Sequence, residues 1–176
     1  MVNCRGEPMC SPSGLFMKQK VKKSKISKAI TQSNIAIVVG EFNQDICEGL
    51  LQGALKTLQK IGFQKNKIRV ISVPGAFEIP LAAAWLAQKK KADAVICLGA
   101  VIRGDTAHFD YVCQAVTEGL TRVQLDYRLP IAFGVLTVDT KAQAVERASD
   151  NDFNKGAEAT MAVLKMLEVK ESIYGQ

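Results

Sequence analysis

The chain has 176 residues, 48% of them hydrophobic, a composition that suits one folded domain with a core and leaves no room for two comfortable domains. No apolar run approaches the roughly 20 residues of a membrane-spanning helix, which excludes an integral membrane protein. The formal charge of +6 lies entirely in residues 1–33, which hold seven basic residues and one acidic residue, whereas the remainder holds sixteen of each. The domain is therefore neutral, and we expect no specific nucleic-acid binding, because contacts through a lysine-rich arm alone are non-specific and salt-dependent.

The composition divides the chain into three segments. Residues 1–33 predict a basic flexible N-terminal arm, residues 34–170 a single domain and residues 171–176 a C-terminal tail. The first residues hold no apolar stretch of the kind that a secretory signal needs, and five cysteines fit a disulfide framework poorly. Three of these cysteines lie in largely apolar surroundings, as small buried side chains do: Cys47, Cys97 and Cys113. We therefore expect a reducing compartment and a cytoplasmic protein.

Apolar patterns predict strands and helices in regular alternation. Short, nearly continuous apolar runs predict four strands buried on both faces, over 35–39, 68–73, 94–101 and 131–138. Helical spacing predicts a helix that ends at Gly62, one over 81–87, one that ends near 127, a short one capped by Thr140 and a last one over 154–169. This alternation predicts an α/β fold: a three-layer αβα arrangement with a four-stranded parallel, flavodoxin-like sheet flanked by helices.

In such a sheet, ligands bind beyond the carboxyl ends of the strands, and the chemically unusual residues of this chain follow those ends. In the loop 103–108, the hydroxyl of Thr106 and the backbone N–H groups at a helix start can receive a phosphate. The imidazole of His108 can give or take a proton there. Taken alone, the loop fits equally well a connecting turn that carries a surface histidine.

Aromatic residues stand after the first two predicted strands. Phe42 and Phe77 can stack on a flat heteroaromatic ring, and Glu78 follows Phe77 directly. The alternative is purely structural: Phe77 closes the core, and Glu78 begins a helix, whose dipole favours a carboxylate.

Two cations, Arg147 and Lys155, flank the break between the last two predicted helices. Together they can grip a phosphate, or they are solvated charges balanced by Glu146 and Glu158. The glycine-rich motifs of nucleotide sites and the nucleophile motif of serine hydrolases are missing from the sequence, and no carboxylate–histidine cluster suggests a metal. We expect neither a metal nor a cofactor.

Seven segments of the chain, in order and in register, resemble the 6,7-dimethyl-8-ribityllumazine synthase (lumazine synthase) family of riboflavin biosynthesis. They are VVGEFN (38–43), GLLQGALKTLQKIG (49–62), VPGAFEIPLAA (73–83), LGAVIRGDTAHFDYVC (98–113), PIAFGVLT (130–137), QAVERA (143–148) and NKGAEA (154–159). The resemblance implies a transferase. It condenses 5-amino-6-(D-ribitylamino)uracil with 3,4-dihydroxy-2-butanone 4-phosphate to 6,7-dimethyl-8-ribityllumazine, releasing phosphate and water.

The resemblance also implies roles for individual residues. His108 matches the family's proton-transfer residue. The positions that match its pyrimidine-binding residues are Phe42, Ala76, Phe77, Glu78, Ala100, Val101, Ile102 and Phe133. The positions that match its phosphate side are Asp105, Thr106, Arg147 and Lys155. Phe133 matches a residue that a neighbouring subunit contributes, so the site is expected to straddle a subunit interface.

The assembly implied by the resemblance is a homopentamer. A larger icosahedral shell and riboflavin synthase as a partner stay open, because residues 148–154 lack the glycines common there in the family. The alternative function is a non-catalytic flavin- or pyrimidine-binding module of the same fold. The presence of His108, Arg147 and Lys155 together disfavours that alternative.

Overall fold

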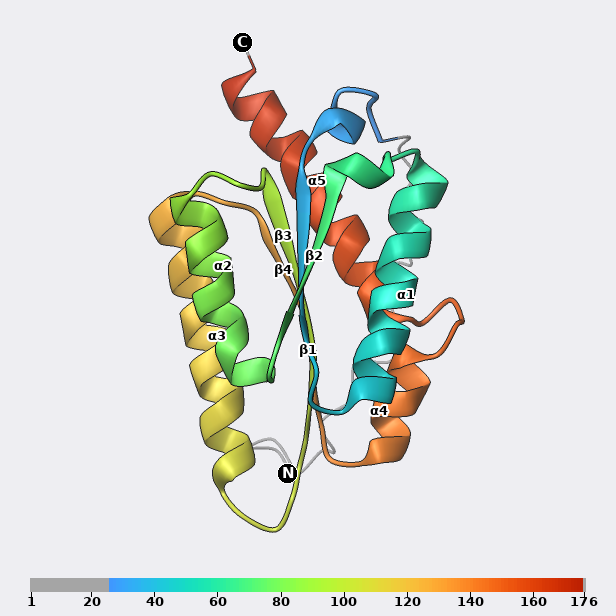
Figure 1. Ribbon diagram of the computed structural model, residues 1–176, viewed down its shortest axis with the longest axis vertical. Coiled ribbons are helices and arrows are strands. Elements are labelled where there is room, and N and C mark those ends of the chain that lie inside the picture. The colour runs from blue at the N-terminus through green and yellow to red at the C-terminus, as the bar shows by residue number, and fades with distance from the viewer. Residues whose placement is uncertain (1–25, 176) are drawn as a thin grey trace, which may run out of the picture.

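A four-stranded sheet runs through the computed structural model, which describes residues 26–175 (Figure 1). Its strands are β1 (Ile35–Gly40), β2 (Ile68–Val73), β3 (Ala94–Ile102) and β4 (Ile131–Val138). They lie in the order β2-β1-β3-β4, and every neighbouring pair is parallel. The predicted parallel, flavodoxin-like sheet is thus confirmed, and β2 and β3 flank β1 at the point where the strand order reverses.

Burial differs between the central strands and the edge strands. All of β1 is buried and nearly all of β3, as their apolar runs predict. The prediction of burial on both faces is wrong for β2, in which Arg69, Val70 and Ser72 are exposed. The reason is its place at the sheet edge, where one side of the strand has no neighbour. At the other edge, β4 exposes Phe133 and Thr137.

Helices cover both faces of the sheet and make the outer layers (Figure 1). One layer consists of α2 (Ile79–Gln88) and α3 (His108–Tyr127), and the other of α1 (Gln44–Ile61), α4 (Lys141–Ala148) and α5 (Lys155–Tyr174). Side chains of β1 alternate between two apolar cores: Ile35, Ile37 and Val39 pack beneath α1 and α5, and Ala36 and Val38 beneath α2 and α3. The sheet therefore separates two independent packing layers.

Several helix ends follow the signals in the sequence. Gly62 ends α1 in the left-handed region, at φ 106°. Thr140 caps α4 in a capping box, because its hydroxyl accepts from the Gln143 N–H and the Gln143 side chain accepts from the Thr140 N–H. The last helix continues past its predicted end at 169 to Tyr174, since no glycine or proline interrupts it before Gly175.

Most of the predicted arm, with Cys4 and Cys10, lies outside the described residues. Its last part, residues 26–33, includes the short 3-10 helix η1 (Ile30–Gln32), and Ile30 is buried in the core beneath α1 and α5. The domain boundaries themselves stay a prediction. None of the helices within residues 26–175 has both the length and the apolar character needed to cross a membrane.

Candidate active site

A cleft of about 550 Å³ opens beyond the carboxyl ends of β1 and β3, where the strand order reverses. Its walls are the end of β1, the turn after β2, the end of β3 and the start of α3. Nine of the residues predicted from the sequence line it: Phe42, Ala76, Phe77, Glu78, Ala100, Val101, Ile102, Thr106 and His108. Segments distant in the sequence thus meet in one cavity.

The wall after β1 combines a fixed backbone with an exposed ring. The Phe42 N–H donates to the Pro74 carbonyl at 3.0 Å, and the Cys47 thiol donates to the Phe42 carbonyl at 3.3 Å. Asn43 adopts the left-handed conformation (φ 61°), and its Nδ2 donates to the Ala100 carbonyl at 3.0 Å. The Phe42 side chain nevertheless remains 72% exposed. A ring held on a rigid backbone and open to solvent can stack on a flat ligand.

The turn after β2 forms the opposite wall. It is the 3-10 helix η3 (Ala76–Glu78), in which Ala76 is buried and Phe77 is 61% exposed. Phe77 therefore lines the cleft, and the alternative in which it closes the core is wrong. Glu78 lines the cleft and also stands at the N-cap position of α2, where its side chain makes no capping hydrogen bond.

The loop after β3 brings the histidine to the mouth of the cleft. His108 is the first residue of α3, and its backbone N–H donates to Thr106 Oγ1 at 3.4 Å. All residues of the segment 103–108 are exposed. Thr106 and His108 line the cleft, whereas Asp105 lies in the same loop but not among the lining residues. The imidazole is thus available to a ligand in the cleft, and Asp105 is not placed there.

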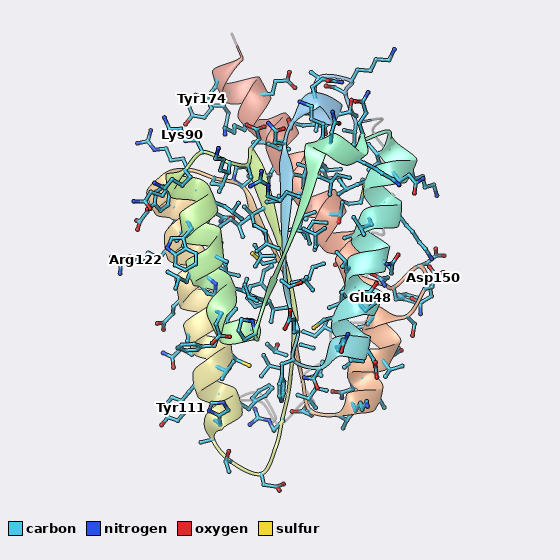
Figure 2. The ribbon with its side chains drawn as sticks, in the orientation of Figure 1. Glu48, Lys90, Tyr111, Arg122, Asp150 and Tyr174 are labelled. Carbon is cyan, nitrogen blue, oxygen red and sulfur yellow. The ribbon has the colours of Figure 1, made fainter. Side chains whose placement is uncertain are left out.

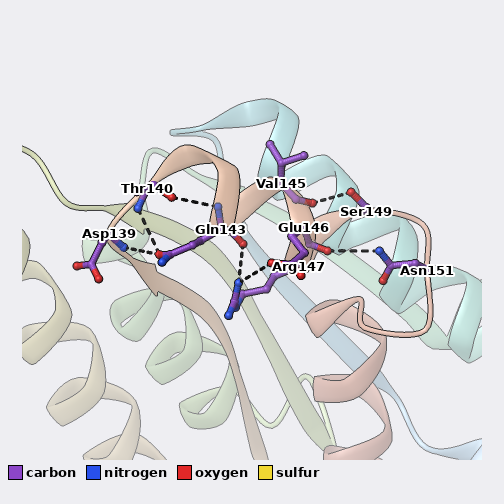
Figure 3. Close-up of polar contacts among 8 residues, drawn as sticks. All are labelled: Asp139, Thr140, Gln143, Val145, Glu146, Arg147, Ser149 and Asn151. Carbon is purple, nitrogen blue, oxygen red and sulfur yellow. Dashed lines mark hydrogen bonds and ion pairs between the residues drawn. The ribbon is translucent and has the colours of Figure 1, made fainter.

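A second, smaller hollow of about 320 Å³, between β4 and the helices α4 and α5, holds three more of the predicted residues and leaves only Asp105 outside both cavities. Phe133 lines it from β4, Arg147 from the last turn of α4 and Lys155 from the start of α5. Arg147 Nη1 donates to Glu146 at 3.3 Å and to a main-chain carbonyl one turn earlier (Figure 3), and Lys155 pairs with Glu158. The ion pairs of the structural alternative therefore exist. Such exposed pairs contribute little free energy, so a phosphate dianion can compete for both cations.

The two cavities lie in different parts of the chain's surface. The cleft is lined by η3 and α3, whereas the hollow lies against α4 and α5, which cover the opposite face of the sheet. Within one chain, Arg147, Lys155 and Phe133 therefore do not line the cleft that holds His108.

Comparison with known proteins assigns this arrangement to a family. The sequence profile of 6,7-dimethyl-8-ribityllumazine synthase matches residues 32–171. A protein of that name from Cytophaga hutchinsonii is 53% identical over 131 residues, which cover 74% of this chain and 82% of the relative. One from Coxiella burnetii is 50% identical over 139 residues, which cover 79% and 92%. The chain belongs to the lumazine synthase family. The resemblance stated from the seven segments and the prediction of an enzyme are confirmed, and the non-catalytic alternative is not favoured.

Five further residues line the cleft of this lumazine synthase family member without having been predicted. They are Asn43, Gly104, Phe109, Tyr111 and Val112. Tyr111 lies on α3 close to its start (Figure 2). Tyr111 and Val112 follow His108 by three and four residues, so helical periodicity could have found them. Asn43 gives no such signal, because its role depends on a left-handed backbone and a contact 57 residues away.

None of the three cysteines within residues 26–175 lines the cleft or the hollow. Burial raises the pKa of the Cys47 thiol to about 11 and that of Cys97 further still, so both stay protonated at neutral pH. Their predicted burial is confirmed, whereas Cys113 is only half-buried. Among residues 26–175, no group of three or more His, Cys, Asp or Glu side chains could hold a metal ion.

Proposed function

We propose that this chain condenses 5-amino-6-(D-ribitylamino)uracil with 3,4-dihydroxy-2-butanone 4-phosphate to 6,7-dimethyl-8-ribityllumazine, releasing phosphate and water, as the penultimate step of riboflavin biosynthesis. The observation that carries the proposal is the cleft, which combines exposed aromatic rings, the ends of parallel strands and one imidazole. The names of the two relatives support it.

The walls of the cleft bind the pyrimidine substrate. Phe42 stacks on the ring, since its side chain is exposed while its backbone is held by hydrogen bonds to Pro74, directly after β2, and to the Cys47 thiol. The turn Ala76–Glu78 and the strand end at 100–102 present backbone groups to the ring edge and the ribityl chain. Binding both substrates in one cavity removes translational freedom, which contributes several kcal/mol to the rate enhancement, up to about 11 when the reacting groups are well oriented.

Proton transfer belongs to His108. Imine formation, phosphate elimination and ring closure each move a proton between organic groups, and an imidazole can both donate and accept one near neutral pH. His108→Ala should therefore lower kcat by about 100-fold or more and leave substrate binding largely intact. A variant with the wild-type kcat would remove His108 from the mechanism.

Phosphate binding belongs to Arg147 and Lys155 of a neighbouring copy, with Phe133 beside them. The cleft and the hollow are different surfaces of one chain, so joining them between copies makes a head-to-tail interface, the kind from which rings are built. We assign the ring five copies, as the resemblance implies, and place the enzyme in the cytoplasm. Arg147→Ala should raise the KM for the phosphorylated ketone at least about tenfold, as expected for a lost charge-assisted hydrogen bond.

Mixing the two variants tests whether His108 and Arg147 of one active site come from different copies of the chain. His108→Ala and Arg147→Ala proteins are unfolded together, refolded as hybrids and assayed by the absorbance of the lumazine product, with Arg122→Ala as an exposed control on α3. If cleft and hollow join between copies, random hybrids regain about a quarter of the wild-type sites, because each site draws His108 and Arg147 from different chains. Activity no higher than the mean of the two parent variants would refute the shared site. A wild-type protein that forms no lumazine from the two substrates would refute the reaction itself.

A further inference from the structure

Arg103 makes an unusual set of contacts directly after β3. Its Nη2 donates to Asp110 Oδ1 at 2.9 Å and its Nη1 to Asp110 Oδ2 at 3.3 Å, while its Nε donates to Asp139 Oδ1 at 3.1 Å. Its guanidinium carbon lies 4.1 Å from the centre of the Phe109 ring. Its backbone N–H donates to the Val138 carbonyl at 2.9 Å. One side chain thus joins the end of β3, the end of β4 and the first turn of α3.

These contacts enclose the part of the chain that carries the histidine. Arg103 and Asp110 bracket residues 104–109, so their two-pronged contact closes this segment into a loop that contains His108 and Phe109. The residues 103–108 are exposed, and a side chain added at Gly104 would meet no atom within 4 Å. The residues before Phe109 therefore have little packing of their own, and the Arg103 side chain ties this segment to Asp139, directly after β4.

The chemistry of the contacts requires an arginine. A planar fork can meet both oxygens of Asp110 while Nε bonds Asp139 and the flat face lies on Phe109, whereas an ammonium group is a point charge without a fork or a flat face and cannot make all of these contacts together. The hydrogen bond to Asp110 raises the pKa of Arg103, so its charge persists at every pH of interest. The ion-paired side chains are 43%, 59% and 70% exposed, and exposed pairs add little to the free energy of unfolding. The contacts fix position far more than they stabilise the fold.

We propose that Arg103 is a positioning residue of the active site: acting through Asp110, Asp139 and Phe109, it holds the first turn of α3 so that the His108 imidazole faces the cleft. The inference rests on the proposed function in so far as His108 carries the proton transfer. Arg103 itself need not touch either substrate.

The kinetic test compares Arg103→Lys, which keeps the charge and loses the fork, with Arg122→Lys. Arg122 forms an exposed ion pair with Asp126 on the same helix and points away from the sheet (Figure 2), so its variant controls for loss of an arginine on α3. Arg103→Lys should lower kcat about tenfold, a modest share of what misplacement of a catalytic group can cause, with the KM of the pyrimidine and the urea midpoint unchanged. Asp110→Asn should act similarly, and the double variant should be no slower than the slower single one. Wild-type kcat in Arg103→Lys, or additive losses in the double variant, would overturn the inference.

A spectroscopic test separates this inference from the proposed reaction. The chain contains one histidine, so a protein labelled with 13C at histidine Cε1 and purified without a histidine tag gives one imidazole signal, that of His108. At fixed pH and without substrate, the signal should shift or broaden in Arg103→Lys and stay unchanged in Arg122→Lys. An unchanged signal in both variants would overturn the positioning role whatever the enzyme's activity. Failure of the wild type to form lumazine would overturn the proposed reaction while this measurement still decides the role of Arg103.

Discussion

Asn154 joins three helices, and its replacement gives the sharpest test of how the hollow between β4, α4 and α5 is built. Its side chain is buried, with 4% exposure. Oδ1 caps α5 by accepting from the Ala157 N–H at 3.0 Å, and Nδ2 lies within 2.8–3.1 Å of the carbonyls of Gly49, Ala148 and Ser149. The amide therefore ties α1 and the end of α4 to the start of α5, between Arg147 and Lys155.

The size of the effect follows from these contacts. Loss of a helix cap costs about 1 kcal/mol. Two amide N–H groups serve the three carbonyls, of which that of Ala148 is buried and the other two are part-buried, and leaving such acceptors without a donor costs about 1 kcal/mol each. We therefore expect Asn154→Ala to lower the free energy of unfolding by about 3–4 kcal/mol. Asn154→Ser keeps an oxygen for the cap and loses the two amide N–H donors, whose carbonyl partners the shorter hydroxyl does not serve together, so its loss should be about 1 kcal/mol smaller.

The assay is urea unfolding followed by circular dichroism at one protomer concentration, because association shifts apparent stability. The matched control is Asn151→Ala in the same connection: Asn151 is exposed, its Oδ1 accepts from the Phe153 N–H at 2.8 Å, and its Nδ2 donates to the Glu146 carbonyl at 3.4 Å (Figure 3). The control should lose less than about 1 kcal/mol. If Asn154→Ala loses no more than the control, the three-way tie does not stabilise the helices.

Three further predictions concern packing, capping and pH. In Gly156→Ala, the new methyl group would overlap the Leu50 carbonyl where α5 crosses α1, so urea unfolding should show a loss of about 2 kcal/mol or more, whereas Gly104→Ala, in open space, should lose less than 1. Thr140→Ala removes the capping box and should lose about 1 kcal/mol in the same assay, a loss that Thr140→Ser should largely reverse. Burial raises the pKa of Cys47 from 9.0 to about 11, so the protonated thiol contributes fully to the free energy of unfolding below pH 9, and this contribution is lost as the pH rises toward 11. Between pH 9 and 11 the free energy of unfolding of Cys47→Ala should therefore fall less steeply than that of the wild type, by about 1.4 kcal/mol per pH unit. Equal slopes in the two proteins would contradict the assignment.

The fold was predictable because its central strands and helix ends carry local signals. The run of β1 is apolar at nearly every position, as a strand covered on both faces requires, and Thr140 and Gly62 mark helix ends by their own chemistry. The order of the strands in the sheet, in contrast, is not given by local signals. Nothing local to β2 says that it lies at an edge, and Val70 is exposed there only because of its place in the sheet.

The sequence predicted those parts of the site whose positions follow from the topology of the sheet. The carboxyl ends of parallel strands must meet at one edge of a sheet, which brought Phe42, Phe77 and His108 together. The separation of Arg147 into another cavity depends on which face each helix covers, and no pattern in the sequence states that. The contacts of Arg103 depend on side-chain geometry across 36 residues, so the sequence showed only a charged residue in a turn.

Exposed apolar side chains give a second, independent argument for the proposed assembly. Phe42 and Phe77 stand uncovered at the cleft, Phe133 stands uncovered at the hollow, and Leu81 and Trp85 are exposed along α2. Single exposed apolar residues are ordinary on a monomer, but large ones gathered at both candidate half-sites are costly to leave in water. Contact between the cleft of one copy and the hollow of the next would bury the rings around a flat substrate and bring Arg147 to it. The same contact would thus cover apolar surface and complete the site, so a lone protomer would keep His108 but lack the cations that hold the phosphate.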